Sequence, residues 1–463
     1  MKKLFILVFT VICSLSLVFL GGCKKDDGKT HVTFYHTMGA NLQTVLNKYI
    51  GKFNEVYPDI VIDHEAIGSY DDVRDQVITQ LQAGTQPTLA YCYPDHVAAY
   101  LRSKKVVDLN TYINDPEVGL TTAQIDDFIE GYYAEGHQFG DDTKMYSLPF
   151  SKSTEVMYYN KTFFEEHEIA IPTHWFATGE TDTTSMEYVI EQIKTIDPNC
   201  VPLGYDSEAN WFITMTEQLN TPYTAAVTDV SGRFLFNDTR NIAFLKAFKT
   251  WHEEGWLTTQ AVYGGYTSGL FTNLKEVDGK VLRSYISIGS SAGATYQCPA
   301  KLTSGEYPFE VGIAPIPQAD TNNQKVISQG PSITMLKQRD EAVNDAAWLF
   351  VKFLLTNVNF QAEFSMASGY VPVLKSTFEV DAYESFLAEA GYTKETIAAL
   401  SAKVCMEQEN NYFTSPAFVG STDARDQVGQ LVISVITAGK TATDADILDL
   451  FQDAVDKCVT LNQ

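Results

Sequence analysis

Apolar and polar positions alternate along the first part of the chain in a way that predicts strands and helices in turn. Runs typical of buried strands lie at residues 31–36, 60–62 and 89–93. Between them, apolar residues recur at helical spacing over residues 42–53 and 73–81. This order predicts parallel strands with right-handed crossovers, and such sheets bind ligands at the carboxyl ends of their strands. The loops expected at those ends are 37–40, 68–70 and 94–96.

The alternation restarts in the second half of the chain. Helical spacing returns at residues 186–196, 210–219 and 244–254, and strand-like runs lie at 203–205, 281–288 and 311–317. Later helical patterns lie at residues 346–355, 384–390, 394–403, 423–437 and 445–459. Together the two series predict an α/β chain with two lobes, each a mostly parallel sheet flanked by helices.

The segment Ser147–Asn160 lies between the two series and is predicted to be a hinge. Pro149 fixes its own φ and biases the preceding residue towards an extended conformation, while Val156–Tyr159 has the composition of a strand. The hydroxyl residues at 151, 153 and 154 suit the floor of a site for a polar ligand. An ordinary buried strand after a turn is the alternative interpretation.

Length and charge limit the classes of function. A chain of 463 residues with 45% hydrophobic content exceeds the size at which one core usually stops growing, about 250–300 residues. Two lobes are therefore expected. The formal net charge is −25, and no basic stripe interrupts it, so the chain is not expected to bind nucleic acid.

The N-terminus has the pattern of an export signal. Residues 1–22 combine Lys2 and Lys3 with an apolar stretch and end in small residues before Cys23. Those small residues resemble a bacterial lipobox, which implies cleavage behind Gly22 and attachment of lipid, with acyl chains such as palmitate, at Cys23. A single transmembrane anchor is the alternative. Residues 23–29 are polar and are predicted to be a short tether.

Five cysteines remain after the signal and Cys23. They are Cys92, Cys200, Cys298, Cys405 and Cys458. Their number is odd and their spacing fits neither a zinc site nor a disulfide framework, so buried thiols are predicted and no metal or other cofactor is expected.

Gly289-Ser-Ser-Ala-Gly293 matches the GxSxG pattern of serine hydrolases. The last histidine of the chain is His252, whereas α/β-hydrolases supply theirs after the serine. We therefore interpret this turn as backbone N–H groups and serine hydroxyls that hold a ligand oxygen, and a bare turn is the alternative. Gly439-Lys-Thr441 lacks the first glycine of a phosphate loop, because position 434 is a serine. A carboxylate pair for glycoside hydrolysis stays open, since its spacing is a property of the fold.

Aromatic residues make up 12% of the chain, and most of them are expected in the core. Tyr70, Trp211 and Tyr370 fall at predicted loops or helix starts. Rings at such places can stack on the apolar face of a sugar.

Several motifs together resemble the bacterial extracellular solute-binding proteins of ABC importers, particularly the branch that binds glycerol 3-phosphate and related sugars. The motifs are Phe34–Met38, Phe53–Pro58, Gly68–Tyr70, Ala83–Pro87, Gly131–Tyr133, Pro149–Thr154, Tyr158–Lys161 and Gly369–Pro372. The resemblance covers nearly the whole mature chain. It implies a two-lobe periplasmic-binding-protein-like fold of type II, with a hinge and a ligand between the lobes.

The resemblance also implies where the ligand binds. The matching positions are Tyr70, Asp95, Ser153, Trp211, Ser290, Gly330 and Tyr370. The acidic contact of the family falls on Pro94 or Asp95, and its phosphate-binding arginine aligns closer to Phe418 than to Arg425. An uncharged sugar or oligosaccharide is therefore expected rather than glycerol 3-phosphate, because a buried phosphate needs a charged partner.

These observations predict a monomeric, lipid-anchored binding protein outside the cell membrane that passes its solute to ABC permease subunits and carries no catalytic residues. The expected lobes are residues 30–147 with 316–366, and residues 148–315 with 367–463, with crossings near 146–150, 313–317 and 365–369. The alternatives are a surface glycoside hydrolase and a lipoprotein that binds glycerol phosphate, glycerophosphodiesters or peptides.

Overall fold

The computed structural model describes residues 27–139, 143–272, 275–277 and 280–463. The predicted signal, Cys23 and the first residues of the predicted tether lie outside this range. Within it, no helix has both the length and the apolar character needed to cross a bilayer.

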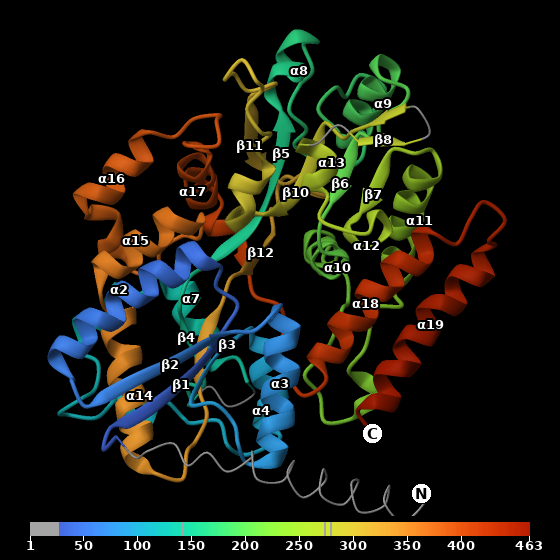
Figure 1. Ribbon diagram of the computed structural model, residues 1–463. Coiled ribbons are helices and arrows are strands. Elements are labelled where there is room, and N and C mark those ends of the chain that lie inside the picture. The colour runs from blue at the N-terminus through green and yellow to red at the C-terminus, as the bar shows by residue number, and fades with distance from the viewer. Residues whose placement is uncertain (1–26, 140–142, 273–274, 278–279) are drawn as a thin grey trace, which may run out of the picture.

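Five strands form the sheet of the first lobe, in the order β2-β1-β3-β13-β4 (Figure 1). β1 (Thr30–His36) pairs in parallel with β2 (Ile60–Ala66) and with β3 (Leu89–Cys92), as the alternating pattern predicts. β13 (Ser332–Met335) and β4 (Leu148–Pro149) are added antiparallel.

Helices cover both faces of this sheet because successive strand residues point to opposite sides. Tyr91 and Leu89 pack in one core with α2 (Ala40–Val56) and α14 (Glu341–Leu355). Ala90 and Cys92 pack in another core with α3 (Tyr70–Ala83) and α4 (Pro94–Leu101). The carboxyl ends of β1, β2 and β3 therefore lead into α2, α3 and α4.

The sheet of the second lobe has the order β14-β12-β5-β10-β6-β7, and β11 also pairs with β5. Its strands are β5 (Ser153–Asn160), β6 (Leu203–Tyr205), β7 (Leu257–Thr259), β10 (Ile286–Ser290), β11 (Val311–Pro315), β12 (Val326–Gln329) and β14 (Tyr412–Phe413). β10, β6 and β7 are parallel to one another, and β5 is antiparallel to β10. Both sheets are thus mixed: parallel strands form one part, and strands next to the crossings run antiparallel.

The two faces of the second sheet have different partners. Met157 and Tyr159 of β5 pack in the core of this lobe with α9 (Met186–Ile196), α10 (Glu208–Gln218), α11 (Thr239–Glu253), α18 (Ser421–Ile436) and α19 (Asp444–Leu461). Val156 and Tyr158 face the other way and join the core that includes residues of the first lobe, α15 (Val358–Ser368) and α17 (Ile397–Glu407). The two lobes therefore share apolar contacts at this face of β5.

Smaller elements complete the described chain. They are α5 (Asn110–Ile113), α6 (Thr122–Asp127), α7 (Glu130–Ala134), η1 (Glu135–His137), α8 (Lys161–Glu166), η2 (Val230–Gly232), α12 (Gln260–Tyr263), α13 (Ser268–Thr272), β8 (Lys275–Val277), β9 (Lys280–Leu282), η3 (Ser291–Gln297), η4 (Lys375–Glu379), α16 (Asp381–Ala388) and η5 (Glu409–Asn411).

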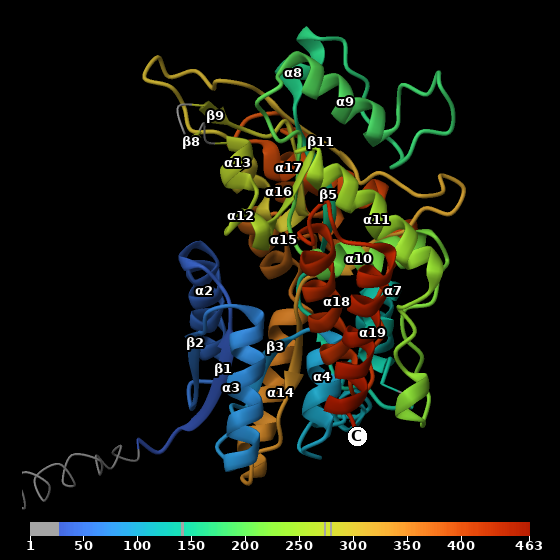
Figure 2. The same cartoon turned by 90° about the vertical axis from the view of Figure 1, so that its right-hand side faces the viewer.

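The strand pairing shows that the chain passes from one sheet to the other at residues 150–152 and at residues 330–331. The second crossing lies later than the expected 313–317, because β11 and β12 both still pair with β5 of the second sheet. A third passage follows α15 at Gly369–Val371, where Lys152 and Val371 form an isolated antiparallel bridge. Figure 2 shows the lobes one above the other, with α18 of the second lobe running beside α4 of the first, which it contacts.

Most predicted elements are present with small shifts at their ends. The strand expected at 281–288 is divided into β9 and β10, and the loop expected at 94–96 is the first turn of α4, where Pro94 occupies a favoured position at the start of a helix. All five predicted buried thiols are free and buried.

Candidate functional site

Three tyrosines lie together at the strand ends of the first lobe. Ser69 caps α3 and forms a reciprocal capping box with Asp72, which makes Tyr70 the first residue of the helix. The Tyr70 ring lies 4.6 Å from Tyr93 and 6.4 Å from Tyr91, measured between ring centroids. Burial raises the pKa of Tyr70 well above its ordinary value, so the hydroxyl stays protonated and can donate a hydrogen bond.

Tyr70 also contacts a residue from the far end of the chain. Its hydroxyl lies 3.1 Å from the hydroxyl of Tyr370, and either oxygen can be the donor. Tyr370 follows Gly369, whose φ of +83° favours glycine and ends α15. Two predicted site residues that are 300 positions apart in sequence are thus brought together.

Ser153 and Ser290 form a second pair, at the strand ends of the other lobe. The Ser290 hydroxyl lies 3.4 Å from that of Ser153 and accepts a hydrogen bond from the backbone N–H of Ala292. Ser290 thereby caps the helical turn η3 in the Gly289–Gly293 motif. A Cβ at Gly369 would lie 3.1 Å from the carbonyl oxygen of Ser291, so the turn before Tyr370 lies against this same motif.

Two buried carboxyl groups lie beside these serines. Tyr205 donates a hydrogen bond of 2.6 Å to Glu155, which is paired with Ser290 across the sheet. Burial raises the pKa of Glu155 to about 8, against the opposing effect of hydrogen bonds from Tyr205 and Asn210. Burial also raises the pKa of Asp206, which accepts from the Thr267 N–H, to about 6. At neutral pH Glu155 is therefore largely protonated and can donate as well as accept hydrogen bonds.

Arg425 joins this group from α18 and was not among the predicted site residues. Its guanidinium donates to the Asn210 side chain, which in turn bonds Glu155. Burial raises the pKa of Tyr93, and the Arg425 charge nearby partly offsets that rise. Arg425 thus faces the first lobe from the second. The sequence did contain a signal for this residue. Arg425 is the only basic residue of α18 and lies near the helix N-terminus, where a positive charge is unfavourable.

Asp95 lies on the first-lobe side of Arg425. The side chain is buried, and its Oδ2 has no hydrogen-bond partner among the described residues. The Asp95 carbonyl accepts a hydrogen bond of 3.0 Å from Thr422 of α18. Both Asp95 and Arg425 act electrostatically on Tyr93 and on His96, which puts the two charges in one neighbourhood.

Trp211 does not join this group, although its place near a helix start suggested that it would. It is only 1% exposed, stacks on Tyr205 with the ring centroids 4.6 Å apart, and packs at a tilt against Phe248 at 4.2 Å in the core of the second lobe. The helix turns this ring inward, because α10 buries most of its residues between the sheet and α18. No face of the ring is left for a ligand.

The structure explains why position 330 is a glycine. Its φ is +90°, and a Cβ there would lie 2.4 Å from the Ser151 carbonyl oxygen and 2.7 Å from the Lys152 Cα. Glycine is needed at this position because two crossing segments touch, backbone against backbone. Gly330 was expected among the ligand positions, and the close contact that requires its glycine is with the hinge backbone.

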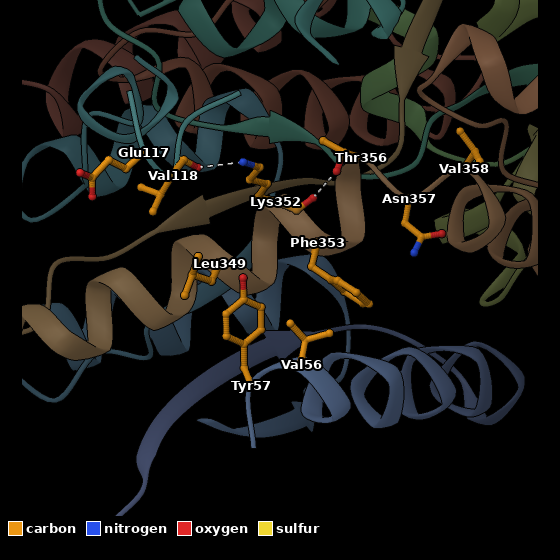
Figure 3. A pocket seen from close by; sticks show the side chains of 10 residues that line it. All are labelled: Val56, Tyr57, Glu117, Val118, Leu349, Lys352, Phe353, Thr356, Asn357 and Val358. Atoms are coloured by element: carbon orange, nitrogen blue, oxygen red, sulfur yellow. Dashed lines mark hydrogen bonds between the residues drawn. The ribbon is translucent and has the colours of Figure 1, made fainter. Parts of the chain in front are cut away.

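Two open hollows, of about 500 and 660 Å³, lie away from these residues on the side of α14. Figure 3 shows the first, between the end of α2 and α14, with Lys352 donating to the Val118 carbonyl. Its lining residues are Val56, Tyr57, Glu117, Val118, Leu349, Lys352, Phe353, Thr356, Asn357 and Val358. None of the predicted site residues lines either hollow.

Comparison with known proteins identifies relatives over nearly the full length. A family described as bacterial extracellular solute-binding protein matches residues 48–388. The sn-glycerol-3-phosphate-binding periplasmic protein UgpB of Salmonella typhimurium is 21% identical over 442 residues, which cover 93% of each chain.

Solved structures share the fold. The GacH receptor of Streptomyces glaucescens, studied unliganded and with acarbose, has a TM-score of 0.70 at 12% identity, covering 94% of this chain and 100% of its own. UgpB from Mycobacterium tuberculosis, in complex with glycerophosphocholine, has a TM-score of 0.68 at 17% identity, covering 93% of this chain and 97% of its own. The two-lobe α/β fold expected from the sequence is confirmed.

Proposed function

The chain belongs to the bacterial extracellular solute-binding proteins, and on this basis we propose that it captures an uncharged, carbohydrate-like solute between its lobes and passes it to the permease of an ABC importer. Binding requires only that the lobes bend about the crossings and enclose the solute. We propose that the protein is a monomer and catalyses no reaction.

The observation that carries this proposal is the gathering of side chains from the first lobe, the second lobe and a crossing. Tyr70 of the first lobe reaches Tyr370 at a crossing, and the turn before Tyr370 lies against the motif that holds Ser290, which pairs with Ser153 within the second lobe. Ligands of open α/β sheets bind at such strand ends. Tyrosine rings offer flat apolar faces, and serine hydroxyls and protonated carboxyls offer the donors and acceptors that sugar hydroxyls need. We propose that these four residues and Asp95 contact the solute.

The charges around Arg425 favour an uncharged solute. Asp426, which lies next to it in α18, interacts with Arg74, Asp71, Asp95 and Arg425. Three carboxylates thus lie near two guanidinium groups, so the neighbourhood is slightly acidic. A phosphate bound at Arg425 would therefore lie close to carboxylates of the same charge.

A second candidate solute is a glycerophosphate-type ester, and the position of Arg425 favours it. A guanidinium facing the other lobe is suited to bidentate recognition of a phosphate, and relatives named above bind glycerol 3-phosphate and glycerophosphocholine. In this candidate, closure of the lobes would bring the phosphate to Arg425.

Thermal unfolding with a small panel of solutes separates the two candidates. The mature chain with Cys23→Ser is heated alone and with maltose, maltotriose, ribitol, glycerol 3-phosphate or glycerophosphocholine. A solute at 100 times its Kd stabilises by about 2.7 kcal/mol, which raises the melting temperature measurably. Stabilisation by neutral polyols alone supports the first candidate. Stabilisation by phosphate esters alone, lost in Arg425→Gln, replaces it with the second.

Two variants test the contact residues once a solute is found. Tyr370→Ala removes a ring and should weaken binding by roughly 1–3 kcal/mol, whereas Ser153→Ala removes one hydroxyl and should cost about 1 kcal/mol. Tyr392→Ala is the matched control, because Tyr392 is 41% exposed and lies outside the proposed site. Calorimetric titration that gives both Tyr370→Ala and Ser153→Ala the wild-type affinity would remove this site.

A surface glycoside hydrolase remains the competing class of enzyme. Chromatography of each sugar after prolonged incubation with the purified chain decides between the two classes. Intact sugar with a raised melting temperature supports the binding protein, and steady release of product overturns it.

We further propose that the mature chain starts at Cys23, carries lipid there and is held on the outer face of the cell membrane. Two acyl chains of a diacylglyceryl group would give a stable anchor, whereas one chain gives only marginal binding. Cys23→Ala should release the protein or leave the precursor uncleaved. Full membrane association of Cys23→Ala at the size of the cleaved form would contradict lipid anchoring.

A further inference from the structure

One buried lysine links all three passages between the lobes. Lys152 lies on the first crossing, between β4 and β5. Its backbone N–H donates to the Val371 carbonyl at 3.2 Å and its carbonyl accepts from the Val371 N–H at 2.7 Å, which ties the first passage to the third. Its Nζ donates to the Gly330 carbonyl at 3.4 Å and to the Ser332 hydroxyl at 3.2 Å, which ties it to the second.

The same ammonium group forms an ion pair with the first lobe. Lys152 Nζ lies 2.6 Å from Glu135 Oε1, and the two side chains are 1% and 2% exposed. Ser332 also donates to Glu135 at 3.1 Å. The three donors of the ammonium group therefore meet three acceptors, and the Ser332 hydroxyl accepts from Lys152 while it donates to Glu135.

A contribution to stability does not by itself explain why the Lys152–Glu135 ion pair is buried here. Two charges removed from water are costly, and apolar residues of similar size are often as stabilising as a buried ion pair. A buried pair with a complete set of hydrogen bonds does, however, accept only one arrangement of the segments that carry it. An apolar contact has no such directional requirement.

We propose that Lys152 and Glu135 are positioning residues that set the relative register of the three passages and, through it, the orientation of the lobes. This proposal rests on the proposed function and deepens it, because the neighbours of these passages are proposed contact residues. Ser153 follows Lys152 directly, and Tyr370 precedes Val371. A slip of one passage against another would separate Ser153 from Ser290 and Tyr370 from Tyr70.

The experiment measures the arrangement of the lobes without any solute, so that its outcome does not depend on the identity of the ligand. Val56 of the first lobe and Ile196 of the second are 61% and 41% exposed, and each is replaced by cysteine for spin labelling. The native thiols among the described residues are buried and are not expected to react. Pulsed electron paramagnetic resonance then gives the distribution of distances between the lobes.

The central variant is Lys152→Met with Glu135→Leu, which keeps the volume of the pair and removes its charges. We expect a melting temperature close to that of the wild type and a distance distribution that is broader or shifted. Lys161→Met with Glu310→Leu is the matched control, because this pair, at 3.0 Å, includes a Glu310 side chain that is 50% exposed. The control should leave the distribution unchanged.

A milder variant decides the matter if the double replacement does not fold. Ser332→Ala removes only the hydroxyl between the two charges, and Ser328→Ala, on the same segment, removes a buried hydroxyl that has no partner among the described residues. Ser332→Ala should broaden the distribution, and Ser328→Ala should not. Wild-type distributions in both Ser332→Ala and the folded double variant, or in Ser332→Ala alone if the double variant is unfolded, overturn the proposal.

Discussion

The lobes meet in two regions of opposite character, the hinge and the contact between α18 and the helices α3 and α4. At the hinge, the charges of Lys152 and Glu135 lie 2.6 Å apart and their side chains are 1% and 2% exposed. At the helix contact, Arg74 and Asp426 lie 3.8 Å apart and their side chains are 12% and 50% exposed. The first pair is almost fully buried and its ammonium group has three hydrogen-bond acceptors, whereas the Asp426 side chain of the second pair is half exposed.

The difference indicates which region separates when the lobes move. Breaking the hinge pair would leave two uncompensated buried charges, which is strongly unfavourable. Separating Asp426 from Arg74 exposes groups that water can solvate, and an exposed pair contributes little. Opening of the lobes should therefore preserve the hinge contacts and break those of α18. The Thr422 hydrogen bond to Asp95 and the proximity of Arg425 to Tyr93 would be lost in that motion.

Replacement of a glycine in each region should give the largest difference between the two regions in the free energy of unfolding. At Gly330 an added Cβ meets the backbone of Ser151 and Lys152, at 2.4 Å and 2.7 Å, and a backbone held in a crossing cannot yield. We expect Gly330→Ala to lower the free energy of unfolding by roughly 3–5 kcal/mol, measured by urea denaturation. At Gly420, before α18, the closest atom is the Asn462 side-chain oxygen at 2.7 Å, which can move, so roughly 1–2 kcal/mol is expected there.

Gly439→Ala is the control for both positions. Its φ is +82° and no atom lies within 4 Å of an added Cβ, so only the cost of a left-handed backbone, about 1 kcal/mol, applies. A loss at Gly330 no larger than that at Gly439 would mean that the crossing is loosely packed, against the view of a rigid hinge.

The next largest effect is expected at Glu155, in the way that the free energy of unfolding depends on pH. Its folded pKa of about 8 lies above the ordinary value of 4.5, so between these values the unfolded chain loses a proton that the folded chain keeps. The free energy of unfolding should therefore decrease as the pH rises through this range and level off above pH 8. Glu155→Gln keeps a polar group of the same shape and removes this loss.

The stability of Glu155→Gln relative to the wild type should increase by roughly 3 kcal/mol between pH 5 and pH 7.5. Urea denaturation at both pH values measures the change. Parallel pH profiles for the two proteins would show that Glu155 is ionised in the folded chain, contrary to its burial. Asp206→Asn is a useful companion, because Asp206 has a smaller rise in pKa, to about 6.

Tyr370→Phe should have an intermediate effect. It removes the hydroxyl that meets Tyr70 and leaves the Tyr70 hydroxyl buried without that partner. A loss of about 1–2 kcal/mol in the free energy of unfolding is expected, and the double variant Tyr70→Phe with Tyr370→Phe should recover part of it. Strict additivity of the two single variants would indicate that the hydroxyl pair contributes nothing of its own.

The smallest effect is expected from Asp426→Asn. The Asp426 side chain is half exposed, so its pair with Arg74 is screened and should contribute less than about 1 kcal/mol. Raising the salt concentration should reduce even this difference between variant and wild type. A loss comparable to that of Gly330→Ala would place the rigid contact at α18 and reverse the comparison.

Much of the fold could be predicted from the sequence. The strand at 31–36, the helix at 186–196 and the helix at 423–437 are present as β1, α9 and α18 with shifts of a few residues at their ends. These elements follow from local periodicity, which is a property of neighbouring residues. The antiparallel strands at the crossings were not predicted, because pairing between β12 and β5 joins residues about 175 positions apart.

The sequence by itself determined which residue types occur at the ends of the strands: Tyr70 and Asp95 after two strands of the first lobe, Ser290 as the last residue of a strand of the second, and Tyr370 after a glycine turn. Only the tertiary structure decided which of them meet. Trp211 was predicted at a helix start and lies in the core, Gly330 contacts the hinge backbone, and Arg425 reaches the neighbourhood of Asp95 from a helix near the C-terminus. Periodicity specifies which face of an element is apolar, but the direction of a single side chain depends on the packing of segments that are hundreds of residues apart.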